Sequence, residues 1–333
     1  EEKIGVALNY LFNNSLSDEV IVRFLGGEPT VSWRELRGAV ALAKDIASNR
    51  QMGVNFTMES NGVWSDEQLQ FISNNFFHVG ISIDGPPDIQ NKHRPLPDGA
   101  PSFQKVDRTV KRLLSLGSVD IKLCPVVTAY SVNRISEIAE FLCREYPGTQ
   151  IFFTPMDAVG YGVDGSSLAP PSIDRYLSGF MEAADVVKSM NTGNDVVTSI
   201  MDFSDLKSTI FCGGNGRNFI ILPTGYVSAC NKVVKSYKDG RDVFLYGAIE
   251  DGAIRFFEGR FKELASYDAV NIDRCKSCYA LNACRGGCPV LKCNGDRINW
   301  NKPDANCEAI KNAVERYLWW MVDNLEPEVD VEM

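Results

Sequence analysis

The distribution of cysteines constrains this chain more than any other feature of its sequence. The first 211 residues hold only Cys124 and Cys143, whereas the last 122 hold the other eight of the ten cysteines. A secreted protein held together by disulfides is usually small and cysteine-dense throughout, whereas close-spaced thiols in one part of a large chain indicate metal binding. The C-terminal third of the chain is therefore predicted to bind metal.

Seven of these eight cysteines form one pattern, which also includes a glycine. The pattern reads Cys212-x12-Gly225-x4-Cys230, then Cys275-x2-Cys278-x5-Cys284-x3-Cys288, and finally Cys307. A Cys-x2-Cys pair lets two thiolates from one turn meet one metal centre, and four thiolates complete the coordination of a [4Fe–4S] cluster. Two tetrahedral zinc sites would use the same thiols, and oxidised disulfides are a weaker alternative.

The complete pattern resembles the SPASM domain, the C-terminal extension of radical S-adenosylmethionine (SAM) enzymes that modify peptides and proteins. The resemblance covers about the last third of the chain and implies two auxiliary [4Fe–4S] clusters. It assigns to the first cluster Cys212, Cys230 and Cys288, and to the second Cys275, Cys278, Cys284 and Cys307.

The fourth ligand of the first cluster is not assigned by this resemblance. Some members of the family carry a further cysteine six residues after the first one, and this chain has Asn218 there. Cys293 then either supplies the fourth thiolate or is a buried spectator thiol. The site would otherwise stay open to substrate or solvent.

The first half of the chain alternates predicted strands with predicted helices. Short β-branched and aromatic runs predict buried strands at Asp18–Leu25, Val54–Met58, His78–Ile83, Ile121–Thr128 and Gln150–Pro155. Ser32 with Glu35, and Ser65 with Gln68, have the spacing of a capping box and predict the starts of two helices. Such an alternation indicates a parallel sheet, and it fits a partial barrel and a doubly wound sheet equally well.

Three predicted strand ends resemble the SAM-binding loops of the same enzymes. The first resembles the GGEP loop and comprises Gly26, Gly27, Glu28 and Pro29. The resemblance implies that Gly27 and Glu28 help to bind the α-ammonium group of SAM, and glycine permits the close backbone approach that this needs. A plain strand-to-helix turn would use the same residue types.

The other two strand ends are Ser60-Asn61-Gly62 and Ser82-Ile83-Asp84-Gly85-Pro86, the latter followed by Arg94. They resemble the third-strand ending and the fourth-strand signature of the family, with Ser82 and Asp84 as candidate hydrogen-bond partners of the ribose. All three segments lie at the carboxyl ends of strands, where barrel enzymes build their sites. Cys124 and Cys143 are predicted to be core thiols, and His78 and His93 receive no role.

Pattern and resemblance together predict an α/β chain, with a partial (β/α)6 TIM-like barrel that lacks its first strand, followed by a loop-rich SPASM domain. The predicted divisions are a partial barrel over 1–165, a linker and helix over 166–211, the SPASM domain over 212–310, and a C-terminal helix and tail over 311–333. A helix is also predicted at Lys3–Phe12.

Radical SAM chemistry requires a Cys-x3-Cys-x2-Cys loop, whose three thiolates leave one iron open for SAM. No cysteine spacing in this sequence matches that loop, and the sequence starts with Glu1 rather than Met. Compared with the family, it starts at the helix that follows the loop. We interpret it as truncated before or within that region, expect the third [4Fe–4S] cluster only in the full-length protein, and expect the chain alone to be inactive.

The resemblance implies that the intact protein forms a 5′-deoxyadenosyl radical, which abstracts hydrogen from a peptide or protein side chain. The leading hypothesis is crosslinking of a ribosomally made precursor peptide, with a flavodoxin or ferredoxin as the electron donor. The alternative is anaerobic sulfatase maturation to formylglycine, whose general base is an Asp where this chain has Asn231. A hypothesis of another class is a non-catalytic iron–sulfur or zinc module. No catalytic residue is assigned.

Charge and hydropathy exclude two classes of partner. The net charge is −9 and no basic run occurs, which argues against a nucleic-acid ligand. No stretch approaches the roughly 18 uncharged apolar residues that a membrane span requires, and no cleavable signal peptide is visible. The sequence therefore predicts a cytoplasmic protein.

Overall fold

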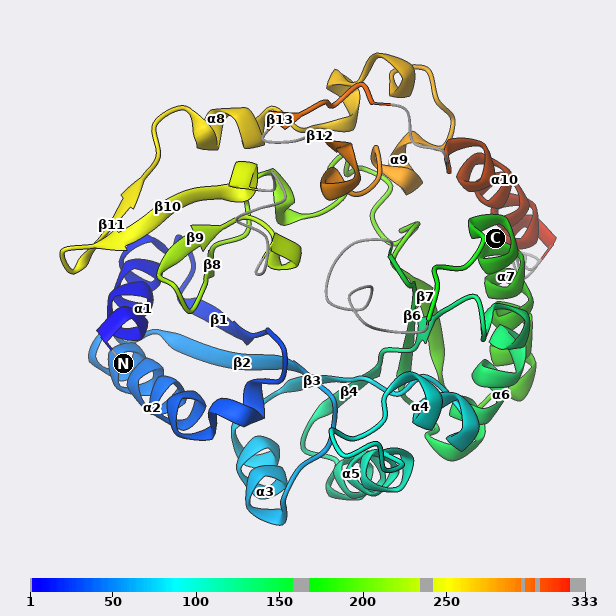
Figure 1. Ribbon diagram of the computed structural model, residues 1–333, viewed down its shortest axis with the longest axis horizontal. Helices are drawn as coiled ribbons and strands as arrows, with labels where there is room; N and C mark the ends of the chain where they lie inside the picture. The colour runs from blue at the N-terminus through cyan, green and yellow to red at the C-terminus, as the bar shows by residue number, and fades with distance from the viewer. Residues whose placement is uncertain (1, 158–167, 234–241, 295–296, 303–305, 324–333) are drawn as a thin grey trace, which may run out of the picture.

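The computed structural model describes residues 2–157, 168–233, 242–294, 297–302 and 306–323. Its first half contains a curved parallel sheet in the order β1-β2-β3-β4-β6-β5, with β7 paired to β6 (Figure 1). The strands are β1 (Glu19–Phe24), β2 (Gly53–Ser60), β3 (His78–Ile81), β4 (Asp120–Leu123), β5 (Val126–Val127), β6 (Gln150–Pro155) and β7 (Asp195–Thr198).

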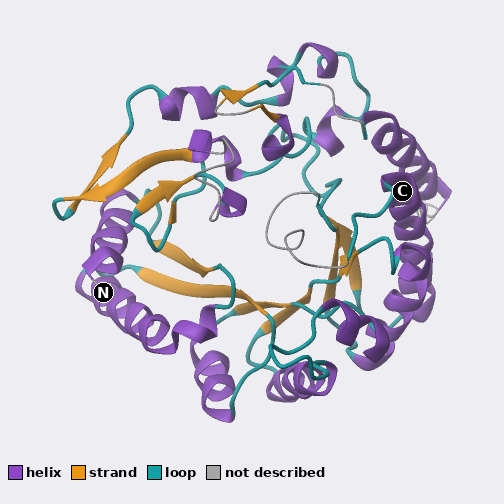
Figure 2. Cartoon of the chain, viewed as in Figure 1, coloured by secondary structure: helices purple, strands orange, loops and turns teal. Residues whose placement is uncertain are grey.

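The helices of this half cover one side of the sheet only. They are α1 (Glu2–Asn14), α2 (Trp33–Asn49), α3 (Asp66–Asn75), α4 (Pro87–His93), α5 (Phe103–Leu116), α6 (Ile135–Glu145) and α7 (Ile173–Met190). Figure 2 shows them outside the arc of strands. Alternate strand residues such as Val79 and Ile81 are fully buried toward these helices. A doubly wound sheet would have helices on both faces, so the predicted partial barrel is confirmed.

The two predicted capping boxes have different outcomes. Ser65 accepts a hydrogen bond from the backbone of Gln68, whose side chain accepts one from Ser65 in return, so this box is confirmed at the start of α3. The box at Ser32 is wrong, because Ser32 makes no side-chain capping bond. A short 3-10 turn, Pro29–Ser32, precedes α2, and Glu28 caps that turn instead.

Two departures from the predicted strands have simple causes. The run Ile121–Thr128 is split into β4 and β5, because Pro125 between them has no N–H to donate to a ladder. Strand β7 was not predicted, because it is only four residues long and lies in the part predicted as linker and helix. Residues 158–167 of the predicted Gly/Ser/Pro linker, and the boundary at 165, lie outside the described residues.

The cysteine-rich part has more regular structure than the sequence analysis predicted. It contains an antiparallel sheet in the order β11-β10-β9-β8 and a short hairpin of two further strands. Its elements are β8 (Ile220–Ile221), β9 (Tyr226–Ser228), β10 (Leu245–Glu250), β11 (Ala253–Phe256), α8 (Arg260–Ala265), α9 (Leu281–Cys284), β12 (Cys293–Asn294), β13 (Arg297–Ile298) and α10 (Cys307–Asp323). A small second core, which includes Val227, Phe244 and Leu264, holds this sheet together.

The cysteine-rich part lies across from the parallel sheet and closes the ring of elements in Figure 1. At one end α1 contacts β11, and at the other α10 packs beside α7. Phe203 stacks on Tyr317 of α10 with ring centroids 4.0 Å apart, and Arg316 donates to the hydroxyl of Ser178 on α7. Among the described residues, no helix combines the length and apolarity needed to cross a membrane.

Candidate functional site

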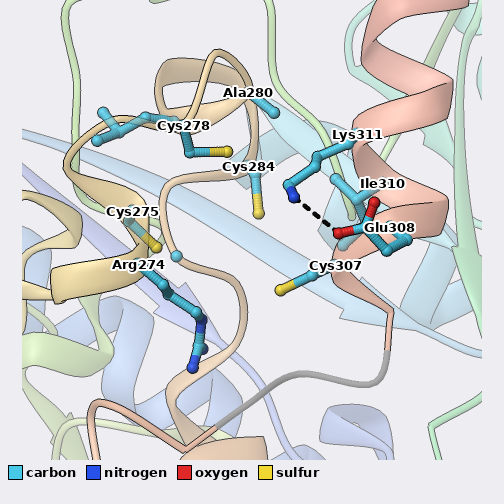
Figure 3. A pocket seen from close by; sticks show the side chains of 11 residues that line it. Arg274, Cys275, Cys278, Ala280, Cys284, Cys307, Glu308, Ile310 and Lys311 are labelled. Atoms are coloured by element: carbon cyan, nitrogen blue, oxygen red, sulfur yellow. Dashed lines mark hydrogen bonds and ion pairs between the residues drawn. The ribbon is translucent and has the colours of Figure 1, made fainter.

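Four of the predicted cluster cysteines surround one cavity. Its volume is about 190 Å³, and its wall includes Cys275, Cys278, Cys284 and Cys307. Figure 3 shows the four sulfur atoms turned toward one another across this cavity. These are the same four thiols that the sequence pattern grouped together, and we call them the second set.

Tight turns bring the second set together. The backbone N–H of Cys278 donates to the carbonyl of Cys275 at 3.0 Å, which closes the turn between this pair. The residues just after Cys284 reverse the chain direction through three successive left-handed conformations, with φ of 52° at Arg285, 78° at Gly286 and 77° at Gly287. Glycine adopts this conformation without strain, which explains two of the three positions.

The other three predicted ligands form a separate group, which we call the first set: Cys212, Cys230 and Cys288. Burial raises the pKa of each of these three thiols, and it raises the pKa of Cys230 to about 12. Repulsion between the thiolate charges of the set raises the pKa of Cys212 and of Cys230 further. Cys230 and Cys288 pack against the small second core, whereas Cys278 and Cys284 pack against the core of the barrel. Two thiols of each set therefore pack on a different core.

One ion pair attaches the first set to the barrel. Lys232 pairs with Asp157, which follows β6. Burial acts to lower the pKa of Lys232, but the charges of Cys288, Asp157 and Cys230 outweigh it and raise the pKa. Because β6 is parallel to its neighbours, Asp157 lies at the carboxyl edge of the sheet, so the first set lies at that edge as well.

Tyr267 lies between the two sets. Its side chain is fully buried, and its hydroxyl donates to the carbonyl of Gly287. Burial raises the pKa of Tyr267, and the charges of cysteines from both sets raise it further. One side chain is therefore within electrostatic reach of both groups of thiols.

The four thiols around one cavity are the ligand number that a [4Fe–4S] cluster requires. None of the ten cysteines forms a disulfide in the structure. In the described part of the chain, no three His, Cys, Asp or Glu side chains are placed to hold a single metal ion. A zinc site with Zn–S bonds of about 2.3 Å keeps its sulfurs only about 3.8 Å apart. An iron–sulfur cage holds its thiolates further apart, because iron and sulfide lie between them.

The position of Cys293 bears on the open fourth ligand. Cys293 packs against the same small core as Cys230 and Cys288 of the first set. Asn218, which replaces the cysteine found in some SPASM domains, has a structural role instead. The side-chain amide of Asn218 donates to the backbone carbonyl of Ala229 at 3.1 Å. The backbone carbonyl of Asn218 accepts a hydrogen bond from the hydroxyl of Tyr246.

The predicted SAM-binding loop after β1 is exposed and is organised by its own glutamate. A Cβ atom added at Gly26 or Gly27 would meet nothing within 4 Å, so the backbone there is open to a ligand. The carboxylate of Glu28 accepts from the hydroxyl of Ser60 and from the backbone N–H groups of Thr30 and Asn61, the last at 2.7 Å. Glu28 therefore ties the loop after β1 to the loop after β2.

The remaining predicted SAM ligands occupy the neighbouring strand ends. Pro29 opens the 3-10 turn, and the Asn61 side chain accepts from the backbone N–H of Val63 at 2.8 Å. Ser82 follows β3, and its backbone N–H donates to the carbonyl of Ser60 at 2.8 Å. The structure thus brings the loops after β1, β2 and β3 together at one edge of the sheet.

Asp84 was predicted as a hydrogen-bond partner of the ribose, and the structure places it in a buried ion-pair network. Its side chain is only 1% exposed. The carboxylate accepts from Nε of Arg94 at 2.8 Å and from the backbone N–H of Val126 at 2.8 Å, and it lies 3.2 Å from Nδ1 of His93. These contacts fill both carboxylate oxygens, so Asp84 ties the end of β3 to β5. They also give a structural role to His93, to which the sequence analysis assigned none.

A charged group on the inner side of the sheet was missed at the sequence level. Arg23 on β1 and Lys122 on β4 both pair with Glu59 on β2, at 3.0 Å and 2.9 Å. Glu59 reaches across β3 because Gly80 has no side chain to block it. Cys124 lies 3.5 Å from the same carboxylate, while Cys143 is fully buried in the helix core as predicted. The one feature of the sequence that could have indicated this group is the alternation along each strand, which places these residues on the inner face of the sheet.

Comparisons with known proteins agree with this geometry. Residues 15–142 match the sequence model of the radical SAM superfamily. The chain is therefore similar to that superfamily over the segment that contains β1 to β5 and most of α6. It is 26% identical to a cysteine-type anaerobic sulfatase-maturating enzyme of Clostridium perfringens over 80% of this chain and 72% of the relative. It is 27% identical to the mycofactocin maturase MftC of Mycolicibacterium smegmatis over 80% of this chain and 65% of the relative.

Solved structures extend the similarity in fold to nearly the whole chain. Native anSMEcpe with bound AdoMet and the Cp18Cys peptide superposes with a TM-score of 0.72 at 19% sequence identity. The match covers 98% of this chain and 92% of the other. At this level of identity the comparison establishes the fold, a partial barrel with a C-terminal cysteine-rich region.

Proposed function

We propose that this protein binds SAM and two auxiliary [4Fe–4S] clusters and takes part in the modification of a peptide by radical chemistry. The observation that carries the proposal is the ion pair between Lys232 and Asp157. It attaches the first set of thiols to the carboxyl edge of the sheet, the edge that also carries the loop Gly26–Pro29. Cofactor and substrate sites of barrel enzymes are built at this edge.

Two regions of the chain bind the two kinds of cofactor in this proposal. At the sheet edge, Glu28 fixes the two loops, and the exposed backbone at Gly26 and Gly27 offers carbonyl acceptors to the α-ammonium group of SAM. In the cysteine-rich part, the first set and Cys293 provide four thiolates, and the second set provides four more. The clusters, when bound, supply one-electron chemistry that no side chain provides.

The substrate that we favour is a ribosomally made precursor peptide that becomes crosslinked. The similarity to the sulfatase-maturating enzymes supports a peptide or protein substrate, because their name states that a sulfatase is matured and a solved structure of anSMEcpe holds a bound peptide. The mycofactocin maturase MftC is a further similar maturase. Sulfatase maturation is the second candidate. The identity to the cysteine-type enzymes favours it, whereas Asn231 opposes it, because an amide does not act as a general base at neutral pH.

Mass spectrometry separates the two candidates. The protein produced from its own gene is incubated anaerobically with SAM, a reductant and either a peptide encoded beside that gene or a sulfatase-derived peptide with its target cysteine. Crosslinking removes two hydrogens and keeps all sulfur, whereas formylglycine formation replaces the cysteine sulfur with oxygen. The proposal expects the first product, and the absence of any modification of either peptide would contradict it.

A separate expectation concerns the 333 residues alone. No Cys-x3-Cys-x2-Cys spacing occurs among their ten cysteines. We propose that a polypeptide of these residues binds SAM without cleaving it. Equilibrium binding of SAM with no release of 5′-deoxyadenosine is the expected result. Release of 5′-deoxyadenosine would overturn this part of the proposal and leave the peptide chemistry standing.

A further inference from the structure

An arginine nitrogen at the cavity of the second set has no hydrogen-bond partner among the described residues. Nε of Arg274 exposes less than 1 Å² and finds no acceptor there. The end of the same guanidinium is anchored, because Nη1 donates to the carbonyl of Asn301 at 2.8 Å. Buried donors in folded proteins nearly always have an acceptor, so an unpartnered one indicates an acceptor that the described part of the chain does not supply.

The surroundings of Arg274 show what kind of acceptor is expected. Arg274 immediately precedes Cys275 and lines the same cavity as the four thiols of the second set (Figure 3). Burial raises the pKa of Cys275, and the positive charge of Arg274 opposes that rise. Lys311, the other cation on the wall, is already paired with Glu308 at 2.7 Å. An anionic group bound in this cavity would offer the unpartnered Nε–H of Arg274 an acceptor.

We propose that the Nε–H group of Arg274 donates a hydrogen bond to a sulfur of the cluster held by the second set and thereby raises the reduction potential of that cluster. This inference rests on the proposed function, because it requires a cluster in the cavity. A hydrogen bond to sulfur and a fixed positive charge both stabilise the more negative reduced state. At the first set the charge of Lys232 is compensated by Asp157.

Three variants test the role of Arg274. Arg274→Met removes both charge and donor, and Arg274→Lys keeps the charge but loses the fixed planar donor. Lys276→Met is the matched control, because Lys276 is two residues further along, exposed, and paired with Asp273 at 2.7 Å. Each protein is reconstituted anaerobically, its iron and sulfide are counted, and its clusters are titrated redox-potentiometrically with detection by electron paramagnetic resonance.

We expect a tenfold or larger shift in the one-electron equilibrium of one cluster in Arg274→Met, which corresponds to a potential lowered by about 59 mV. Arg274→Lys should show a smaller shift in the same direction, and Lys276→Met none. In wild-type protein labelled with ¹⁵N-arginine, the reduced cluster should show coupling to one exchangeable proton and to one arginine nitrogen. This last measurement needs no variant and so does not depend on the folding of one.

The possible failures are distinguishable. Wild-type protein that assembles no cluster on the second set would overturn both the proposed function and this inference. A cluster that assembles normally would leave the proposed function standing. In that case, an unchanged potential in Arg274→Met, together with no arginine coupling in the wild-type spectrum, would overturn the inference alone.

Discussion

The role of Asp84 gives a sharp prediction, because the structure and the family resemblance suggest different roles for it. The carboxylate is 1% exposed, and it accepts from Arg94 and from the backbone of Val126. Asp84→Asn keeps an oxygen for Val126 but turns an NH2 group toward the Nε–H of Arg94. Removal of one partner from a buried ion pair destabilises by about 3–5 kcal/mol. Because Arg94 is 31% exposed, we expect the lower end, about 3 kcal/mol.

The pH dependence of this effect follows from the pKa of Asp84. Burial acts to raise that pKa, but Arg94, His93 and the N–H of Val126 outweigh burial and lower it. The folded pKa therefore lies below the unfolded value of about 3.9. The stabilisation is fully present above the unfolded pKa and is lost as the pH falls through the folded pKa. The stability difference between wild type and Asp84→Asn should thus be constant from pH 8 to about 5 and shrink only below about 4.

Urea unfolding of the anaerobically reconstituted protein, followed by circular dichroism, measures this difference. With an m-value of about 3 kcal/mol/M, the midpoint should fall by about 1 M in urea. Asp251→Asn is the control, since the side chain of Asp251 is 86% exposed, and its effect should stay within about 0.5 kcal/mol. If the urea midpoint of Asp84→Asn is unchanged while its binding of SAM is weakened, the structural role of Asp84 is refuted. That result would favour the predicted hydrogen bond from Asp84 to the ribose instead.

Three further predictions concern other parts of the fold and are measured in the same unfolding assay. Gly80→Ala should destabilise the protein by about 1 kcal/mol, because the new Cβ displaces Glu59 from its ion pairs. The control Gly38→Ala lies on α2, where an added Cβ meets nothing within 4 Å, and it should stabilise by about 0.5 kcal/mol. Equal effects of the two substitutions would contradict the role of Gly80. Tyr267→Phe should cost about 1–2 kcal/mol by leaving a buried carbonyl without its donor, and a neutral result would show that the hydroxyl is not needed. A double-mutant cycle of Lys232→Met and Asp157→Asn should give a coupling energy of about 1 kcal/mol, and no coupling would mean that the ion pair does not join the two parts.

The sequence predicted those parts of the fold that depend on local chemistry. The alternation of parallel strands and helices followed from apolar runs and helical periodicity, although it did not choose between a partial barrel and a doubly wound sheet. Ser65 with Gln68 marked the start of α3 correctly. Ser32 with Glu35 had the same spacing but failed, because Pro29 already starts a 3-10 turn that Glu28 caps. The same local spacing therefore has different outcomes when a neighbouring residue provides a better cap.

Other parts of the fold depend on contacts that a local pattern does not contain. The strands β8 and β9 span two and three residues, which is too short for a recognisable alternation, so the antiparallel sheet was missed. The group formed by Arg23, Glu59 and Lys122 was missed because its members lie on three different strands. The grouping of the thiols into two sets was predicted only through the family resemblance, since spacing alone left zinc and disulfides open.

The inorganic content of the protein tests the central claim most directly. Iron, acid-labile sulfide and zinc are measured after anaerobic reconstitution of the wild type, of Cys212→Ala with Cys230→Ala, of Cys275→Ala with Cys284→Ala, and of the buried-thiol control Cys143→Ala. For a polypeptide of the 333 residues we expect about eight iron and eight sulfide per chain in the wild-type sequence and the control, and about four of each in either double variant. Two zinc ions without sulfide, or loss of all iron from one double variant, would contradict two separate clusters.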